Sequence, residues 1–377
     1  PSPPPPGGIW IHAVSVGEVQ AIAPLVHLLL DEHSNLPITV TTTTPTGSEQ
    51  VRRSFGDRVW HSYMPLDLPA FLDRFLGRVR PRHLLMVETE VWPNLLRVCR
   101  RHGVETLLAN ARLSERSLRG YCRFGAFARR VFGSIDRVAA QSVADAARFV
   151  QLGVRRERIE VTGSIKFDKS IPASVVEQVE VMRRNWSERP VWVAASTHEG
   201  EEEIMLAAHA RLLKRLPRAL LILVPRHPER FDRVATAIIR AGFEPVRRSA
   251  GRLPAAEDPV YLADTMGELP VLLGAAGAAF IGGSLARVGG HNMLEAAAQG
   301  VPVCFGPHTF NFAFIGQMLL DAGAARRVSD ASELASVMAD WLGDASARSE
   351  AGEAGRRIVE RNRGALRRLY GMLEQRL

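Results

Sequence analysis

Short apolar runs alternate with amphipathic helical patterns along the first half of the chain. The runs have the composition of buried strands, and they lie at 9–16, 38–43, 83–87, 106–109, 137–140 and 159–162. Apolar positions with helical spacing lie between them, for example at 19–32, 92–102 and 142–152. Short buried strands that alternate with helices are typical of a parallel, doubly wound sheet.

A second series of the same kind follows a short helical pattern at 175–185. Its predicted strands are 191–195, 219–224, 260–262, 278–281 and 302–305, and its helices include 201–216, 229–241, 269–273, 292–298 and 313–322. We therefore predict an α/β protein with two Rossmann-like doubly wound domains and an interdomain cleft. The predicted division is 1–166, 167–345, and a charged C-terminal helix, 346–377, that could pack back on the first domain.

The composition is that of an ordinary globular protein, with 46% hydrophobic and 23% charged residues among 377. No apolar stretch approaches the ~20 residues that a membrane-spanning helix needs, and the pattern predicts no signal peptide. The opening Pro-rich stretch, without a methionine, is interpreted as a linker exposed by trimming. Cys99, Cys122 and Cys304 match no metal or disulfide spacing, so we expect buried thiols in a reducing compartment.

Positive charge is concentrated in the first half of the chain. Residues 1–166 hold 22 basic and 15 acidic residues, whereas the remainder holds 26 and 25. If 113–132 is one helix, four arginines form a single stripe beside Phe124 and Phe127. The stripe and its neighbour Arg112 comprise Arg112, Arg116, Arg119, Arg123 and Arg130. This pattern indicates either a solvated face or a surface for anionic lipid or a phosphorylated acceptor.

Acidic residues follow two of the predicted strands. Glu18 comes after the first strand, and Glu88 and Glu90 come after the strand at 83–87. Ligands of open α/β sheets bind at this carboxyl edge, so the pattern suggests proton transfer. Ser15 and Glu18 could instead form a capping box. A helix start lowers the pKa of a carboxylate, whereas a neighbouring carboxylate raises it. Glu88 and Glu90 could alternatively hold a divalent cation, although oxygen-only sites generally need more ligands.

Turns in the second half carry residues suited to binding an anion. Ser196 and Thr197 lie at a strand-to-helix turn, and Arg226 and His227 follow the next strand. A glycine-rich loop that could wrap a phosphate with its amides, and the helix start after it, contain Gly282, Gly283, Ser284, Gly289, Gly290, Asn292 and Glu295. The turn 264–268, with Met266 and Gly267, indicates either base recognition or simple capping.

The ordered set of these motifs resembles the 3-deoxy-D-manno-octulosonic acid (Kdo) transferases of lipopolysaccharide assembly. The motifs span residues 9 to about 320, most of the chain. They are His12-Ala-Val-Ser-Val-Gly-Glu18, Thr41-Thr-Thr-Thr-Pro-Thr-Gly47, Val87-Glu-Thr-Glu-Val-Trp-Pro-Asn94, Asn110-Ala-Arg-Leu-Ser114, Thr162-Gly-Ser-Ile-Lys-Phe-Asp168, Pro225-Arg-His-Pro-Glu229 and Gly282-Gly-Ser through Glu295.

This resemblance implies a GT-B fold and a set of functional roles. The second domain would bind the donor CMP-Kdo, and the first would bind lipid A or its tetra-acylated precursor. The family is inverting and uses no bound metal or other cofactor, with its base at Glu18 and its second carboxylate in the Glu88–Glu90 pair. Its usual membrane anchor is not in this sequence, so we expect peripheral attachment, or an anchor outside this chain, at the cytoplasmic face of the bacterial inner membrane.

The residues support the same chemistry without reference to the family. A sugar hydroxyl that attacks an anomeric carbon needs a base on the face opposite the departing nucleotide. CMP carries one phosphate, so helix starts together with Arg226 or Lys166 could stabilise it without magnesium. The arginine-rich face would suit a phosphorylated acceptor on an anionic membrane surface.

Two other functions remain open from the sequence. One is a GT-B transferase with a UDP-sugar donor, of the lipid A disaccharide synthase type, which uridine diphosphates would stabilise and CMP would not. The other is nucleic-acid binding, suggested by a pI of about 10.1. No recognition motif or stacking pattern accompanies the basic residues, so we expect no nucleic-acid partner.

Overall fold

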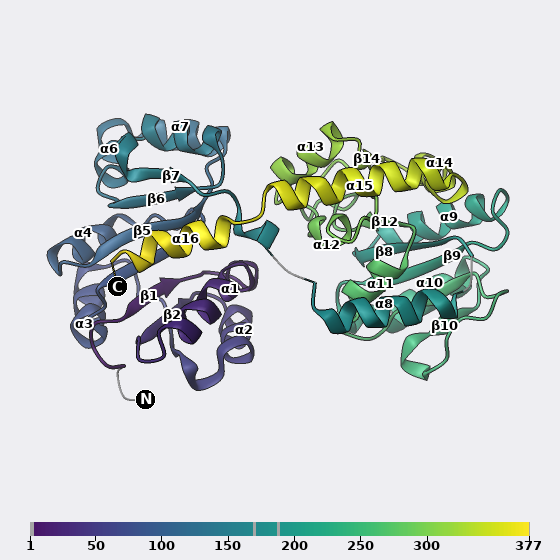
Figure 1. Cartoon of the computed structure of the whole chain (residues 1–377), viewed down its shortest axis with the longest axis horizontal. Helices are drawn as coiled ribbons and strands as arrows, with labels where there is room; N and C mark the ends of the chain where they lie inside the picture. Colours follow the sequence, from purple (N-terminus) through teal and green to yellow (C-terminus); the bar gives the residue numbers. More distant parts are fainter. Residues whose placement is uncertain (1–3, 169–170, 187–188, 377) are drawn as a thin grey trace. The chain divides into compact units, whose positions relative to one another are not determined.

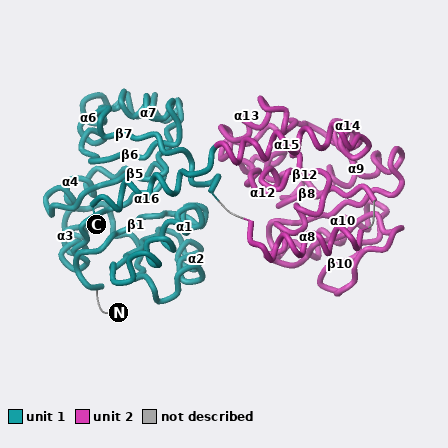
Figure 2. The backbone as a smooth tube through the Cα atoms, viewed as in Figure 1, with its two compact units in different colours: residues 1–169, 362–377 teal, residues 170–361 magenta. Residues whose placement is uncertain are grey.

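The chain forms two compact units, residues 1–169 with 362–377 (unit 1) and residues 170–361 (unit 2; Figure 2). The computed structural model describes residues 4–168, 171–186 and 189–376. The sequence placed the division at 166/167, and the units divide at 169/170.

Unit 1 is a parallel sheet of seven strands covered by helices (Figure 1). Its strands are β1 Ile9–His12, β2 Ile38–Thr42, β3 Trp60–Tyr63, β4 His83–Val87, β5 Glu105–Ala111, β6 Arg137–Ala140 and β7 Ile159–Val161, in the order β3-β2-β1-β4-β5-β6-β7. Its helices are α1 Val16–Glu32, α2 Pro45–Phe55, α3 Pro69–Val79, α4 Pro93–Arg101, α5 Glu115–Cys122, α6 Gly125–Phe132, α7 Val143–Gln151 and α16 Ala365–Glu374. Ile9 and Ile11 pack in one core cluster and Trp10 in the other, because successive side chains of a strand point to opposite faces.

Unit 2 repeats this architecture. Its parallel strands are β8 Val191–Thr197, β9 Leu220–Pro225, β10 Pro245–Arg247, β11 Val260–Leu262, β12 Ala278–Ile281, β13 Val303–Phe305 and β14 Ala325–Arg327, in the order β10-β11-β9-β8-β12-β13-β14. Its helices are α8 Ala173–Asn185, α9 Glu201–Leu213, α10 Phe231–Arg240, α11 Leu269–Ala275, α12 Leu294–Ala297, α13 Ala313–Asp321, α14 Ala331–Gly343 and α15 Ala345–Arg361.

The predicted fold class, α/β with two doubly wound sheets, is confirmed. The sequence analysis missed three strands, β3, β10 and β14, and each lies at an edge of its sheet. An edge strand has one neighbour and leaves more of its surface to solvent, so it does not require a continuous apolar run. The sequences Trp-His-Ser-Tyr, Pro-Val-Arg and Ala-Arg-Arg of these strands show this.

The single C-terminal helix predicted at 346–377 is wrong. The chain forms α15 and α16, which are separated by residues 362–364, and Gly364, the N-cap residue of α16, has a left-handed φ of 92° that glycine adopts without strain. The helix α15 belongs to unit 2 and α16 to unit 1. Within unit 1, the Asp168 carboxylate accepts hydrogen bonds from the backbone N–H groups of Gly364 (2.5 Å) and Leu366 (2.6 Å), which fixes the start of α16.

The expectation of three buried thiols holds for two of them. Cys99 and Cys304 are buried, where burial raises the pKa of Cys99 to about 12. Cys122 is exposed because the last turn of α5 lies on the surface. Among the described residues, no helix has the length and apolar character required to cross a membrane.

Candidate active site

The predicted carboxylates of unit 1 lie at the two central strands of its sheet. Strands β1 and β4 are neighbours, and the strand order runs outward from them in both directions. Ligands of doubly wound sheets bind at this reversal of strand order, outside the carboxyl ends of the strands. Glu18 lies in the first turn of α1, just after β1, and Glu88 directly follows β4.

Glu18 bonds to the turn that precedes its helix. Its Oε2 accepts a hydrogen bond from the backbone N–H of Val14 (2.8 Å), and its Oε1 accepts one from the Ser15 hydroxyl (3.3 Å). Ser15 is the N-cap residue, but its side chain accepts no backbone hydrogen bond. The reciprocal capping box is therefore not formed, because the Ser15 hydroxyl donates to the Glu18 carboxylate and accepts no backbone N–H bond.

The environment of Glu18 favours its protonated form. Its pKa is raised from 4.5 to about 7, first by burial and then by the negative charges of Glu88 and Glu90, against the lowering effect of the Val14 bond. The predicted influence of a neighbouring carboxylate is thus present, although burial is the larger cause. A carboxylate with a pKa near neutrality can accept a proton from a hydroxyl at physiological pH.

Glu88 and Glu90 have different surroundings. Glu88 has a left-handed φ of 61°, a strained conformation for a residue other than glycine. Its Oε1 lies 2.8 Å from Nζ of Lys166, and its Oε2 lies 4.0 Å from Nη2 of Arg112. Glu90 accepts a hydrogen bond from Nε1 of Trp92 (2.9 Å). Lys166, which the sequence assigned to the donor, is therefore an ion-pair partner of Glu88 within unit 1.

Two buried polar side chains near this edge were missed by the sequence analysis. His12 ends β1, and its Nε2 has no hydrogen-bond partner among the described residues. Burial lowers the pKa of His12 to about 4. Asn110, at the end of β5, has a φ of 52°, accepts a hydrogen bond from the backbone N–H of Ile165 (3.2 Å), and leaves its Nδ2 without a partner in the described structure. Both residues lie in motifs that carry the family resemblance, and this was the one sequence feature that could have identified them.

The strand order of unit 2 reverses between β8 and β12, and most of the predicted donor-binding residues follow these strands or β9. Ser196 and Thr197 end β8, where Ser196 has a left-handed φ of 56° and Thr197 is buried. Gly282 follows β12, and its backbone N–H donates to Ala195 O (2.8 Å). The predicted gathering of these turns at one edge follows from this pairing of β8 with β12.

The glycine-rich loop differs from the prediction in one respect. Its amides were expected to be open for a phosphate, but those of residues 283–286 all donate to the carboxylate of Glu201. The Ser284 hydroxyl is also engaged, since it donates to Ile281 O and accepts from the Gly306 N–H. Farther on, the backbone N–H groups of Gly289 and Gly290 donate to Gly283 O.

The side chains beyond this loop form a small hydrogen-bonded start to α12. Asn292 Oδ1 accepts a hydrogen bond from the backbone N–H of Leu294 (3.1 Å), and Asn292 Nδ2 donates to Glu295 Oε1 (3.4 Å). Both side chains are partly exposed, so the predicted contact of Glu295 with a ribose stays a prediction.

Three histidines and Arg226 gather beside the ends of β8 and β9. Nε2 of His198 lies 2.8 Å from Nε2 of His291, their rings stack at 5.0 Å, and the His227 ring lies 5.3 Å from that of His198. Burial, followed by the charges of His198 and Arg226, lowers the pKa of His291 to about 4. Arg226 is exposed and supplies the permanent positive charge of this group.

The turn with Met266 and Gly267 is held at both ends by arginines. Asp264 accepts from Nε of Arg247 (2.6 Å), and Glu268 accepts from Nη2 of Arg248 (2.7 Å). The Arg248 bonds hold the pKa of Glu268 below its usual range against burial. For Asp264, burial is the largest single influence and raises the pKa, but hydrogen bonds from Ser249 and then Arg247 together hold it below its usual range. Met266 is 60% exposed between the two fixed ends. The turn is thus presented to solvent, as base recognition would require.

The predicted single arginine stripe is wrong because 113–132 is not one helix. Gly125, with a φ of 47°, separates α5 from α6. Arg116 and Arg119 lie on α5 and Arg123 follows it, whereas Arg130 lies on a different helix, α6. The arginines are nonetheless exposed, and Phe124 and Phe127 are 66% and 59% exposed beside them.

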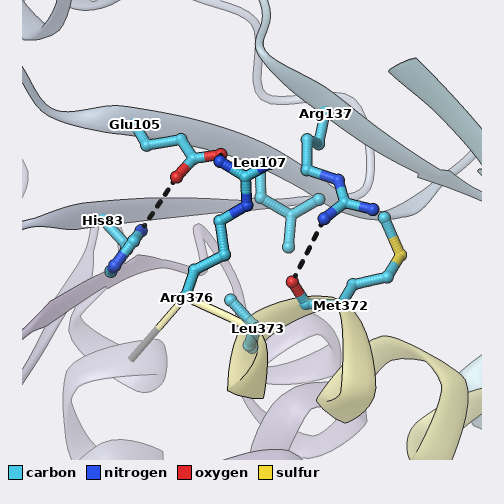
Figure 3. A pocket seen from close by; sticks show the side chains of 7 residues that line it. All are labelled: His83, Glu105, Leu107, Arg137, Met372, Leu373 and Arg376. Atoms are coloured by element: carbon cyan, nitrogen blue, oxygen red, sulfur yellow. Dashed lines mark hydrogen bonds and ion pairs between the residues drawn. The ribbon is translucent and has the colours of Figure 1, made fainter. Parts of the chain in front are cut away.

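A small pocket lies at the opposite, amino-terminal edge of the unit 1 sheet (Figure 3). Its walls include Glu105 and Arg137, which begin β5 and β6, and the end of α16. Arg376 pairs with Glu105 at 3.0 Å, and Arg137 donates to Met372 O (3.4 Å). These contacts fasten α16 to the sheet, so we assign the pocket to attachment of that helix.

The described residues contain no group of three or more His, Cys, Asp or Glu side chains arranged to hold a metal ion. Glu88 and Glu90, the alternative metal ligands, bond instead to Lys166 and Trp92. Metal-independent chemistry stays a prediction.

Comparison with known proteins gives a consistent set of similarities. Residues 1–169 match the family model described as 3-deoxy-D-manno-octulosonic-acid transferase (kdotransferase). The 3-deoxy-D-manno-octulosonic acid transferase of Haemophilus influenzae is 43% identical over 98% of this chain and 87% of its own length. That of Bordetella pertussis is 40% identical over 97% of this chain and 86% of its own.

Solved structures of lower identity share the fold. The UDP-GlcNAc 2-epimerase of Neisseria meningitidis matches 94% of this chain and 98% of its own, with a TM-score of 0.61 and 15% identity. At that identity the likeness concerns the fold alone, which is of the expected GT-B type.

Proposed function

The chain belongs to the Kdo transferase family, and from this premise we propose that it moves Kdo from CMP-Kdo to lipid A or its tetra-acylated precursor, with inversion and with Glu18 as general base. It is a glycosyltransferase of lipopolysaccharide biosynthesis. The proposed roles extend this activity to particular residues and substrates.

One observation above all supports Glu18 as the base. Its carboxyl group has a pKa of about 7 at the central carboxyl edge of unit 1, beside Glu88 and Glu90. In the proposed step, Glu18 takes the proton of the acceptor hydroxyl while that oxygen forms a bond to the anomeric carbon. The bond from this carbon to the phosphate oxygen of CMP breaks, and CMP leaves with the electron pair.

The carboxyl edge of unit 2 is the proposed donor site. Arg226, with His198 and His291 beside it, would bind the phosphate of CMP, and the fixed turn of Met266 and Gly267 would contact the cytosine. When the bond to the anomeric carbon breaks, the phosphate of CMP gains one negative charge. One guanidinium and nearby dipoles can stabilise that charge, so no metal is assigned a role.

The exposed arginines and phenylalanines of α5 and α6 support an acceptor that is lipid-borne and phosphorylated. Lipid A offers phosphates to the guanidinium groups and acyl chains to Phe124 and Phe127. We propose that this part of unit 1 contacts the anionic cytoplasmic surface of the inner membrane while the acceptor is bound.

The deciding experiment is incubation with freshly generated CMP-Kdo and the tetra-acylated precursor, analysed by mass spectrometry. A product heavier by one or more Kdo residues is expected, and CMP, but not UDP, should raise the melting temperature. Stabilisation by UDP without Kdo transfer would replace the proposal with a UDP-sugar transferase.

The proposed base gives the rate a definite pH dependence. Glu18 acts only when ionised, so kcat/KM should rise about tenfold per pH unit below about 7 and level off above it. Kinetics with CMP-Kdo between about pH 5 and 9 measure this limb. A rate that stays constant through the acidic half of that range would remove Glu18 from the proton transfer.

Reversal of charge at Arg116, Arg119 and Arg123 to Glu should weaken sedimentation with anionic liposomes at least about tenfold, since each basic residue near such a surface contributes about 1 kcal/mol. The control is the same reversal at Lys214, Arg215 and Arg233, which are exposed residues of unit 2. Equal binding by both variants would mean that Arg116, Arg119 and Arg123 form only a solvated face.

A further inference from the structure

A buried carboxylate, Glu201, fills the cradle formed by the glycine-rich loop. Glu201 begins α9 and is 1% exposed. It accepts five backbone hydrogen bonds, from the N–H groups of Gly283 (2.7 Å), Ser284 (3.0 Å), Leu285 (2.9 Å), Ala286 (3.2 Å) and His198 (2.9 Å).

Successive amides that converge in this way form a concave anion site, and a charged acceptor makes each bond stronger than a neutral one would. The two partners are separated by more than eighty positions along the chain, so the bonds tie the start of α9 to the loop after β12. Without an anion there, five N–H groups, two in fully buried and three in partly buried hydrogen bonds, would lose this acceptor, which is costly. The loop conformation therefore depends on a negative charge at this point.

The next residue extends the arrangement to a third loop. Glu202 is also 1% exposed and receives both terminal nitrogens of Arg230, at 2.7 and 2.9 Å. Arg230 Nη1 also donates to Thr197 O (3.3 Å). The first turn of α9 thereby joins the loops that follow β8, β9 and β12, which are the loops of the proposed donor site.

We propose that Glu201 is a positioning residue of the donor site. Its carboxylate occupies the amide cradle that a nucleotide phosphate would otherwise take, and this fixes the loop that carries Gly289, Gly290 and His291. The donor's phosphate is consequently left to side chains such as Arg226. The identity of the donor rests on the proposed function, whereas the loop fixing does not.

Glu201→Gln tests the proposal with little change in size. One amide oxygen replaces two carboxylate oxygens, and the new NH₂ group faces N–H donors. Hydrogen exchange of the amides of 283–286, measured by mass spectrometry without nucleotide, should become faster, and the Kd for CMP should rise about tenfold or more. Glu203→Gln, an exposed neighbour in the same helical turn, is the matched control and should behave as the unsubstituted protein.

Rescue by an added small anion distinguishes the proposed role from a general loss of structure. In Glu201→Ala, formate should enter the vacated cradle and restore both slow exchange and CMP binding, whereas chloride at equal ionic strength should not. If this variant melts early, formate should raise its melting temperature specifically. Unchanged exchange and CMP affinity in Glu201→Gln, or no formate-specific recovery in Glu201→Ala, would overturn the proposal.

Loss of CMP binding and loss of loop fixing give different results in these measurements. If the unsubstituted protein fails to bind CMP, the proposed donor is wrong, and the exchange data still decide whether Glu201 holds the loop. If CMP binds but Glu201→Gln leaves exchange unaltered, the positioning role is wrong and the donor stands.

Discussion

Glu18→Gln should lower kcat by about 10²–10⁴-fold, the range that general base catalysis contributes. The amide cannot accept the proton of the acceptor hydroxyl, yet it can still accept the Val14 N–H bond and keep the turn in place. CMP should bind with unchanged affinity, because every residue of the proposed donor site lies in unit 2. Release of CMP from CMP-Kdo and the Kd for CMP measure the two halves of this expectation.

Unfolding is not expected to explain that loss. The pKa of Glu18 in the folded protein, about 7, lies above its ordinary value of 4.5, so ionisation of Glu18 opposes folding as pH rises between these values. A neutral amide removes this opposition, and Glu18→Gln should melt no lower than the unsubstituted protein at pH about 8. Glu32→Gln, an exposed position of the same helix, is the control with normal kinetics. Substantial turnover by Glu18→Gln would exclude Glu18 as the base.

Local patterns were sufficient to predict where the carboxylates of unit 1 lie. An apolar run, a turn and a helical pattern place Glu18 and Glu88 at the ends of strands, and the parallel sheet then brings all such ends to one edge. That β1 and β4 are neighbours depends on strand order, which the pattern leaves open. The edge strands β3, β10 and β14 escaped detection because their burial, and therefore their sequence signal, is weak, whereas the edge strand β7 was predicted.

Contacts between distant segments account for what the sequence analysis could not supply. A glycine-rich loop indicates flexible backbone and available amides, but the partner of those amides is set by tertiary packing, which placed Glu201 among them. Lys166 shows the same limit. Its position in a motif suggested a phosphate contact, whereas the fold sets its ammonium group against Glu88.

Lys166→Met should lower the free energy of unfolding of unit 1 by about 1–3 kcal/mol, because it removes the nearer cation of the half-buried Glu88 and leaves, among the described residues, only Arg112, at 4.0 Å. The side chains of this pair are only 22% and 17% exposed, so solvent screens the lost charge poorly. With Glu88 less neutralised, the pKa of Glu18 should also rise further, which moves the acid limb of kcat/KM toward higher pH. Chemical denaturation and the pH–rate profile measure the two effects.

Glu88→Gln should shift the pKa of Glu18 in the direction opposite to Lys166→Met. It removes one of the charges that raise the pKa of Glu18, so the acid limb should move toward lower pH. In the double variant, loss of both charges should recover most of the stability that Lys166→Met loses alone. If Lys166 instead serves the donor, Lys166→Met will raise the Kd for CMP while stability and the pH limb stay unchanged, and Glu88→Gln will rescue nothing.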